Sequence, residues 1–166
     1  MPGWPSQFPE QLLTIRCDTR EQQPWTFASC YGHLATVRGT VRHGDYVLDI
    51  DPLLATVERK SLQDFVKCCG TDRVRFFKQI AGMRGATQFP LLIIEADYGM
   101  LEMGCGWRGK MTPEQVLAVL HKVQNDVPVL LCRSRDEAER GCYRHLRLAL
   151  KHRYQKCREF ARALQR

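Results

Sequence analysis

The hydrophobic and polar positions of the chain follow two periods, one typical of strands and one typical of helices. Short stretches rich in apolar and β-branched residues, bounded by turn-forming residues, predict six strands, at 12–17, 35–41, 45–50, 55–60, 89–96 and 127–132. The stretches 89–96 and 127–132 are almost continuously apolar, as expected of strands that are buried on both faces. The chain therefore builds a sheet, with other segments to cover it.

Helix-start signals lie between the later strands. Ser61, followed three residues later by Asp64, predicts a capped helix, and Thr71 or Asp72 can cap a second one that runs to about residue 83. Thr112 opens the strongest start, with Pro at the next position and Gln two residues after that, and predicts a helix to about residue 125. A last helix is expected from residue 136 to near the end of the chain.

An early antiparallel meander followed by strand–helix–strand units predicts an α/β fold of a single domain, with a mixed central sheet flanked by helices. We expect an irregular leader at 1–11, the folded domain at 12–150 and a basic helical extension at 151–166. The stretch 98–110 is rich in Gly and Met, which predicts a mobile excursion with Trp107 and Arg108 exposed.

The formal net charge of +7 over 166 residues favours an anionic partner, with nucleic acid first. Basic residues are concentrated in the last 27 positions, which include Arg147 and Lys151. This segment is interpreted as a phosphate-binding surface, and a solvated helical face is the alternative.

Eight cysteines occur without a C-x-x-C pair, so reduced thiols are expected rather than a zinc site. No signal peptide and no membrane-length apolar run are found. We expect an intracellular protein, cytoplasmic in a bacterial or phage-infected cell and nuclear in a eukaryote.

Candidate chemistry gathers around three residues. Side chains alternate along a strand, so Glu58 and Lys60 point to one face and Arg59 to the other, and pairing with the preceding strand brings Asp45 close. Two carboxylates beside an ammonium suit Mg²⁺ or Mn²⁺ acting on a phosphodiester. With Asp18 added, three carboxylates would repel one another, which also favours a bound divalent ion.

Structural explanations exist for the same residues. Asp45 follows a Gly and could belong to a turn, and Glu58 could be an edge-strand charge that pairs with Lys60. Asp64 is explained equally well by helix capping. Other groups could be surface or supporting charges: Asp18 and Glu21 with Arg20, Arg75 on a helix surface, and Glu95 at a strand end.

The order of these motifs resembles the XPF-type structure-specific endonucleases. The resemblance covers about residues 15–150 and rests on Asp18-Thr19-Arg20-Glu21, Gly44-Asp45, Glu58-Arg59-Lys60 with Asp64, the helix segment at 75–79, and the strand that ends at Glu95. It implies a restriction-endonuclease-like fold and divalent-metal-dependent cleavage of branched or single-strand/duplex junction DNA. It implies catalytic or supporting roles for Asp18, Asp45, Glu58, Arg59, Lys60 and Asp64, metal binding by Asp18, Glu21, Asp45 and Glu58, and a phosphate contact by Arg75. Further basic residues are candidate DNA contacts: Arg20, Arg73, Lys78, Arg147 and Lys151.

The chain departs from many family members because no helix-hairpin-helix domain and no Walker A motif are recognised, so no nucleotide cofactor is expected. The family commonly dimerises through its last helices, for which Leu146, Leu148, Leu150 and Phe160 are candidates. A catalytically silent DNA-binding or scaffold subunit is the alternative function, and an unrelated basic RNA-binding module is a third.

Overall fold

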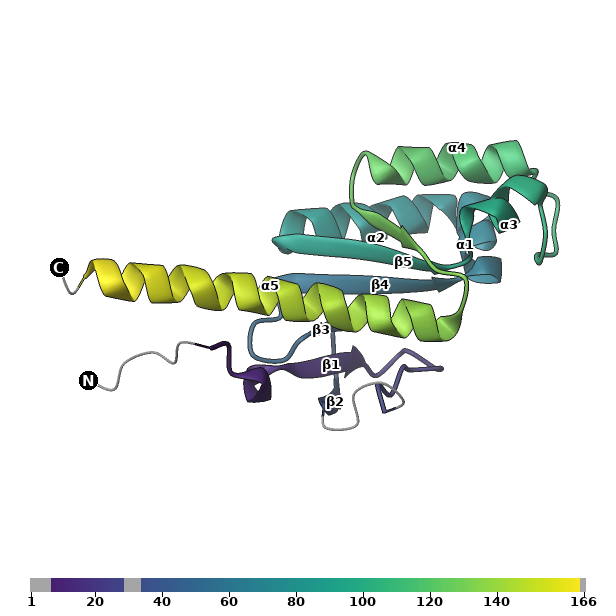
Figure 1. The fold of residues 1–166 in the computed structure, drawn as a ribbon. Coiled ribbons are helices and arrows are strands. Elements are labelled where there is room, and N and C mark those ends of the chain that lie inside the picture. Colours follow the sequence, from purple (N-terminus) through teal and green to yellow (C-terminus); the bar gives the residue numbers. More distant parts are fainter. Residues whose placement is uncertain (1–6, 29–33, 165–166) are drawn as a thin grey trace.

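A computed structural model describes residues 7–28 and 34–164 of the chain, and residues 1–6 of the expected leader, Cys30 and the last two residues lie outside this part. Six strands form one sheet in the order β2-β1-β3-β4-β5-β6 (Figure 1). The strands are β1 (Thr14–Asp18), β2 (Ala35–Gly39), β3 (Tyr46–Leu48), β4 (Ala55–Ser61), β5 (Phe89–Glu95) and β6 (Val129–Leu131). The helices are η1 (Glu10–Leu12), α1 (Leu62–Cys69), α2 (Arg73–Ala86), α3 (Tyr98–Met103), α4 (Pro113–Gln124) and α5 (Arg135–Ala163).

The sheet is mixed, as the sequence predicts. Strand β3 pairs antiparallel with both β1 and β4, whereas β1 and β2, β4 and β5, and β5 and β6 pair in parallel. The expected early antiparallel meander is therefore wrong for β2, which lies outside β1 and pairs with it in parallel. In the β3–β4 pairing, Tyr46 lies opposite Val57, and in the β1–β3 pairing it lies opposite Cys17. This register places the last residues of β1, the first residues of β3 and the last residues of β4 at the same end of the sheet.

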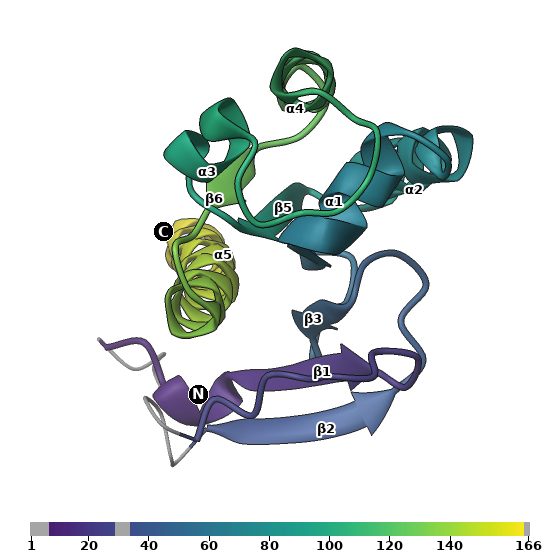
Figure 2. The ribbon, with the colours of Figure 1, turned by 90° about the vertical axis from the view of Figure 1, so that its right-hand side faces the viewer.

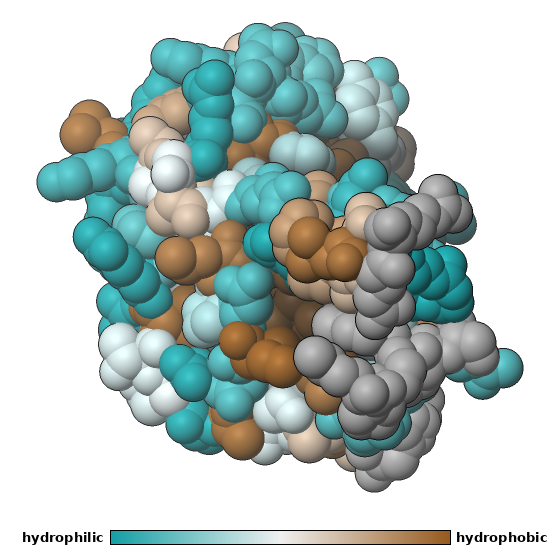
Figure 3. All heavy atoms as spheres, turned by 90° about the vertical axis from the view of Figure 1, so that its left-hand side faces the viewer, coloured by the Kyte–Doolittle hydropathy of each residue, from teal (hydrophilic) through white to brown (hydrophobic). Residues whose placement is uncertain are grey.

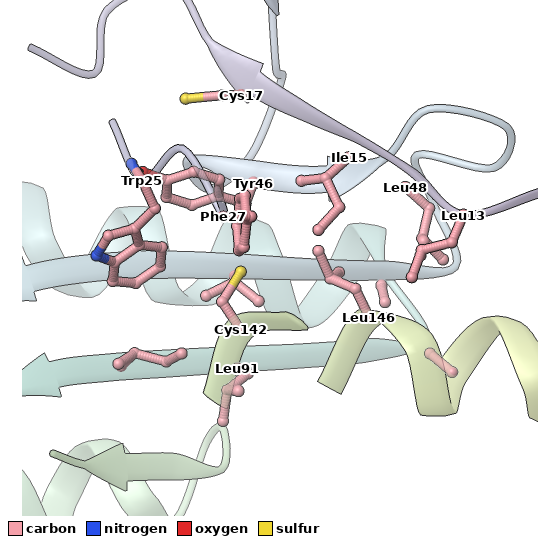
Figure 4. Packing of buried hydrophobic residues seen from close by; sticks show 14 of the residues in the cluster. Leu13, Ile15, Cys17, Trp25, Phe27, Tyr46, Leu48, Leu91, Cys142 and Leu146 are labelled. Atoms are coloured by element: carbon pink, nitrogen blue, oxygen red, sulfur yellow. The ribbon is translucent and has the colours of Figure 1, made fainter. Parts of the chain in front are cut away.

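Helices cover both faces of the sheet (Figure 2). Helix α5 packs on one face over a core that contains Ile15, Trp25, Tyr46 and Leu146 (Figure 4). Helices α1, α2, α3 and α4 contribute to a second core, together with Leu92 and other residues of β5. Residues 91–94 of β5 are all buried, which confirms the prediction of a strand covered on both sides.

Capping explains where the helices begin. The Ser61 hydroxyl accepts a hydrogen bond from the N–H of Asp64, and Thr112 and Gln115 form the predicted capping box. Asp72 precedes α2 but makes no side-chain cap bond. Asp97 caps α3 and Ser134 caps α5.

Three further predictions about the chain path are wrong. The stretch 98–110 was expected to be a mobile excursion, but its first half forms α3, because the Asp97 carboxylate accepts the Met100 N–H and Gly104 ends the helix with φ +69°. Trp107 is partly buried against the second core rather than exposed. Strand β6 lies at the edge of the sheet, so it is only partly buried.

Helix α5 runs from the carboxyl ends of β4 and β5 to the opposite end of the sheet and beyond it (Figure 1). Near its start, Arg135 contacts Glu95 at the end of β5, and further on His145 contacts the carbonyl of Phe89 at the beginning of that strand. The end of the molecule toward which α5 projects carries hydrophobic patches among hydrophilic side chains (Figure 3). None of the described helices is long and apolar enough to cross a membrane.

The cysteines of the described residues are all free thiols. Cys17, Cys68, Cys69, Cys132 and Cys142 are buried, and Cys105 and Cys157 are exposed. The expectation of reduced thiols agrees with this arrangement, although two of them are not buried.

Candidate active site

Main-chain hydrogen bonds hold Asp45 at the end of the sheet where β1 and β4 finish. Its N–H donates to the carbonyl of Val57 and its carbonyl accepts the N–H of Asp18, both at 2.8 Å. The preceding Gly44 has φ +85°, and a Cβ there would lie 2.3 Å from Oγ1 of Thr56 and 2.9 Å from the carbonyl oxygen of Val57. Only glycine fits this approach, so the Gly-Asp pair is a structural necessity as well as a candidate motif.

Glu58 and Lys60 point to the face of α1 and α2, as alternation predicts. The Lys60 ammonium donates to Oε1 of Glu58. The Glu58 side chain is 1% exposed, and its Oε2 is buried without a hydrogen-bond partner in the described part of the chain. A buried carboxylate oxygen without a partner is unfavourable unless a cation or a donor reaches it.

The electrostatics of the pair match a cation site. Burial, reinforced by the charge of Glu58, raises the pKa of Asp45 from its ordinary value of 3.8 to about 7. Burial also raises the pKa of Glu58, although Lys60 and the neighbouring Gln79 side chain act in the opposite direction. Burial alone would lower the pKa of Lys60, but the nearby Glu58 and Asp45 carboxylates raise it, so Lys60 is an ammonium at neutral pH.

Residues that could hold a divalent ion are therefore Asp45 and Glu58. Among residues 7–28 and 34–164, no three His, Cys, Asp or Glu side chains lie close enough to form a complete protein cage. Mg²⁺ does not require one, because it is commonly held by one or two carboxylates together with water and substrate phosphate oxygens. The free Oε2 of Glu58 and the raised carboxylate pKa values fit such an ion.

Asp18 does not join the two carboxylates in the expected three-acid cluster. Its Oδ1 accepts from the N–H and Nε of Arg20 at 2.7 and 2.8 Å, and its Oδ2 accepts from Nη2 of Arg20 at 3.1 Å and from the N–H of Val41 at 2.7 Å. Burial alone would raise the pKa of Asp18, but these bonds lower it to about 2. The carboxylate is therefore fully used in holding the loop after β2 against β1.

Arg59 points to the opposite face, as predicted, and its guanidinium is 9% exposed. It forms a two-bond ion pair with Glu95 at 2.8 and 3.0 Å, lies 3.3 Å from Oε1 of Glu21, and lies over the Trp25 ring. The ion-pair partners of Arg59 are thus Glu95 and Glu21. Glu95 supports a basic group, one of the alternatives considered from the sequence.

Glu21 and Asp64 both reach the surface around the pair. Glu21, not Asp18, lines the hollow in front of Asp45 and Glu58. Asp64 also lines it, but its side chain is 58% exposed and accepts from the Ser61 hydroxyl at 2.7 Å. Helix capping thus accounts for the position of Asp64 within the structure.

This hollow, named here the main hollow, has a volume of about 730 Å³ and opens between β4, α2 and the loop before β3. Within the described chain, three of its cations make no ion pair: Arg42, Arg75 and Lys78. Arg20 also lines it but is bound to Asp18. The free cations surround the carboxylates with positive charge that is available to phosphate groups.

Sequence reasoning missed Arg42, His43 and Gln79 of the main hollow. Residues 42–44 were interpreted only as a turn, although two basic side chains directly before Gly44-Asp45 are a usable signal. The DNA contacts expected at Arg73, Arg147 and Lys151 lie outside the hollow. Arg73 lies over the Phe77 ring, and Arg147 is bound to Glu10, which fastens the N-terminal segment to α5.

The fold and the main hollow together define a restriction-endonuclease-like nuclease fold, and comparisons with known proteins agree. The chain matches "XPF from Aeropyrum pernix" with a TM-score of 0.66 at 18% identity, over 82% of this chain and 61% of that one. It matches "XPF from Aeropyrum pernix, complex with DNA" with a TM-score of 0.63 at 16% identity, over 84% and 66%. No curated protein sequence matches significantly.

The sequence also matches the ERCC4 domain model over residues 17–141. The chain therefore belongs to the ERCC4 domain family, which confirms the XPF-type resemblance. It spans about 61% of the first XPF structure, so the activity of that whole protein does not pass to this chain without further argument.

Proposed function

We propose that this protein is a divalent-metal-dependent endonuclease that hydrolyses phosphodiester bonds of DNA. The observation that carries the proposal is the pair of carboxylates, partly buried Asp45 and buried Glu58, placed with Lys60 in a hollow that three cations, unpaired within the described chain, also line. Membership of the ERCC4 domain family and a likeness to an XPF structure solved with DNA support it.

The residues around the two carboxylates have different proposed roles. Asp45 and the free Oε2 of Glu58 would hold Mg²⁺ or Mn²⁺, which when bound screens phosphate charge and makes water more acidic. Lys60, whose pKa the neighbouring Glu58 and Asp45 carboxylates raise, would donate hydrogen bonds to a phosphate oxygen or to the attacking water. Glu21 is better placed than Asp18 for a further contact, because Asp18 is saturated.

Arg75 and Lys78 would contact the DNA backbone near the scissile phosphate. The preference for branched or junction DNA is part of the proposal and follows from the XPF-type motifs. A homodimer would use Leu148 and Phe160 of α5, which are exposed, whereas Leu146 and Leu150 belong to the core of the subunit and cannot contribute.

Cleavage of labelled forked, flapped and blunt duplex DNA with Mg²⁺ or Mn²⁺ tests the proposal. Glu58→Gln and Lys60→Ala should each lower the rate by about a hundredfold or more. The matched control is Glu102→Gln, which removes one exposed carboxylate on α3 and should cleave as the wild type does. Tight DNA binding without cleavage by the wild type under either metal would instead support a silent DNA-binding subunit.

A further inference from the structure

A second hollow adjoins the main hollow on the far side of the loop before β3. Its volume is about 210 Å³, and we name it the side hollow. It is lined by Arg16, Thr40, Val41, Arg42, His43, Val47, Pro52, Leu53 and Thr87. Arg42 and His43 line both hollows, so the two meet at these residues.

The side hollow lies on the face of the sheet opposite α5. Arg16 of β1 and Val47 of β3 are cross-strand partners, and their sequence neighbours Ile15 and Leu48 belong to the core under α5. Alternation therefore places Arg16 and Val47 on the opposite face, and Thr87, which follows the last residue of α2, lines the same hollow. Four of the nine lining residues form an apolar wall: Val41 and Val47 at its buried base, and Pro52 and Leu53, which are more exposed.

The boundary between the hollows is held in place from two sides. The carbonyl of His43 accepts the Thr56 hydroxyl at 2.6 Å. Its ring lies against α2 at Gly82, where a Cβ would come within 2.8 Å of Nδ1 of His43. The loop before β3 is consequently fixed both to β4 and to α2. It lies between the two carboxylates of the main hollow and the apolar wall of the side hollow.

Within the part of the chain that the structure describes, one unpaired positive charge lies where the two hollows meet. Arg16 is neutralised by Asp49, with Nη2 and Oδ1 2.6 Å apart. Arg42 is exposed and makes no ion pair within the described residues. An anionic group at the junction of the two hollows would therefore meet the Arg42 guanidinium, next to a surface that prefers an apolar face.

We propose that the side hollow binds one unpaired nucleotide of the DNA, with its base on the apolar wall and its phosphate at Arg42. The inference rests on the proposed nuclease function and names the substrate feature that the site selects. The volume is below the 300–1,000 Å³ range of pockets for drug-sized ligands, so it suits a single base rather than a stacked run. A paired base would first have to leave its stack at a cost of a few kcal/mol, which favours DNA that is already single-stranded there.

The test is DNA binding by fluorescence anisotropy without divalent metal, comparing a duplex that carries a single-stranded overhang with a blunt duplex of the same length. Leu53→Gln should weaken overhang binding about fivefold or more, as expected for loss of one base contact, and should change blunt-duplex binding much less. Arg42→Gln, which also removes a cation from the main hollow, should weaken binding of both DNAs, and that of the overhang duplex more strongly. Both residues are exposed, so thermal unfolding should be unaffected. The matched controls are Met103→Gln, which changes an exposed apolar side chain on α3 (70% exposed), and Arg133→Gln.

A fluorescent 2-aminopurine base placed at successive overhang positions locates the contact. Its emission should change on wild-type binding at one position next to the junction, and Leu53→Gln should abolish that change. Equal weakening of overhang and blunt duplex, or wild-type overhang binding by both variants, would overturn the subsite and leave the nuclease proposal standing. Failure of the wild type to bind either DNA would overturn both proposals.

Discussion

The main-chain N–H of Arg59 donates a 2.8 Å hydrogen bond to Oδ2 of Asp45. One residue of β4 thus serves both faces of the sheet, because its backbone holds a candidate metal ligand while its side chain is buried among Glu95, Glu21 and Trp25 on the other side. Arg135 extends this cluster by contacting Glu95 and donating to the carbonyls of Gln23 and Pro24. The position of Asp45 is therefore coupled through Arg59 to these ion pairs, of which the Arg59–Glu21 pair also borders the main hollow.

Arg59→Met tests this dependence. Removing one member of a buried ion pair leaves the acidic partners without compensation, so we expect the free energy of unfolding to fall by about 3–5 kcal/mol. Urea denaturation measures it. The matched control is Arg16→Met, which breaks the half-exposed pair with Asp49 and should cost about 1 kcal/mol or less. Similar losses in the two variants would contradict a special role for the Arg59 cluster.

Asp45 makes stability depend on pH in a direction that can be worked out. Its pKa is raised to about 7 from 3.8, so between these values the folded protein binds more protons than the unfolded chain, and stability declines as the pH rises. Without metal, Asp45→Asn should therefore unfold at a higher temperature than the wild type above about pH 7. Thermal melts across this range decide it, and a variant that is less stable at every pH would refute the burial argument.

The same titration governs metal binding, because a proton and a cation compete for Asp45. Added Mg²⁺ or Mn²⁺ should raise the melting temperature of the wild type more strongly as the pH increases through about 7. Asp45→Asn should show a much smaller rise. A pH-independent rise, or one of equal size in the variant, would place the ion elsewhere.

Gly44→Ala should shift the backbone that carries Asp45. The positive φ and the contacts with Thr56 and Val57 leave no space for a methyl group, so we expect a loss of about 1–3 kcal/mol and loss of cleavage. Gly85→Ala is the matched control: its added Cβ meets nothing within 4 Å, and the exchange within α2 should stabilise slightly. Chemical denaturation and the cleavage assay read both, and an unchanged Gly44→Ala would disprove the strain argument.

Asp18 should contribute to stability at neutral pH and lose that contribution in acid. Its pKa is lowered to about 2, so the stabilisation is present above the ordinary value of 3.8 and disappears as the pH falls through about 2. Asp18→Asn should accordingly be less stable than the wild type near neutrality, and the two should converge at low pH. A constant difference throughout an acid titration followed by circular dichroism would show that the Arg20 and Val41 bonds do not depend on the charge.

The sequence predicts the sheet and the pair Glu58 and Lys60 because both follow from short-range rules, namely alternation along a strand and turn chemistry at Gly44. It does not predict that Asp18 is saturated, since one of its donors, Val41, lies 23 residues away and is brought close only by the path of the loop after β2. The exposure of β6 is likewise a matter of position in the sheet. An apolar run is the same in the sequence whether the strand becomes central or lies at an edge.

Helix α5 joins the two ends of the molecule as one stiff element. Its 29 residues make a rod on the order of 40 Å long, with Arg135 packed against the carbonyls beside Trp25 and its last turns projecting past the sheet. A molecule bound at the C-terminal end of α5 would therefore lie at a fixed distance from the main hollow. Adding or removing whole helical turns beyond Tyr154 would change this distance and leave the residues of the main hollow in place.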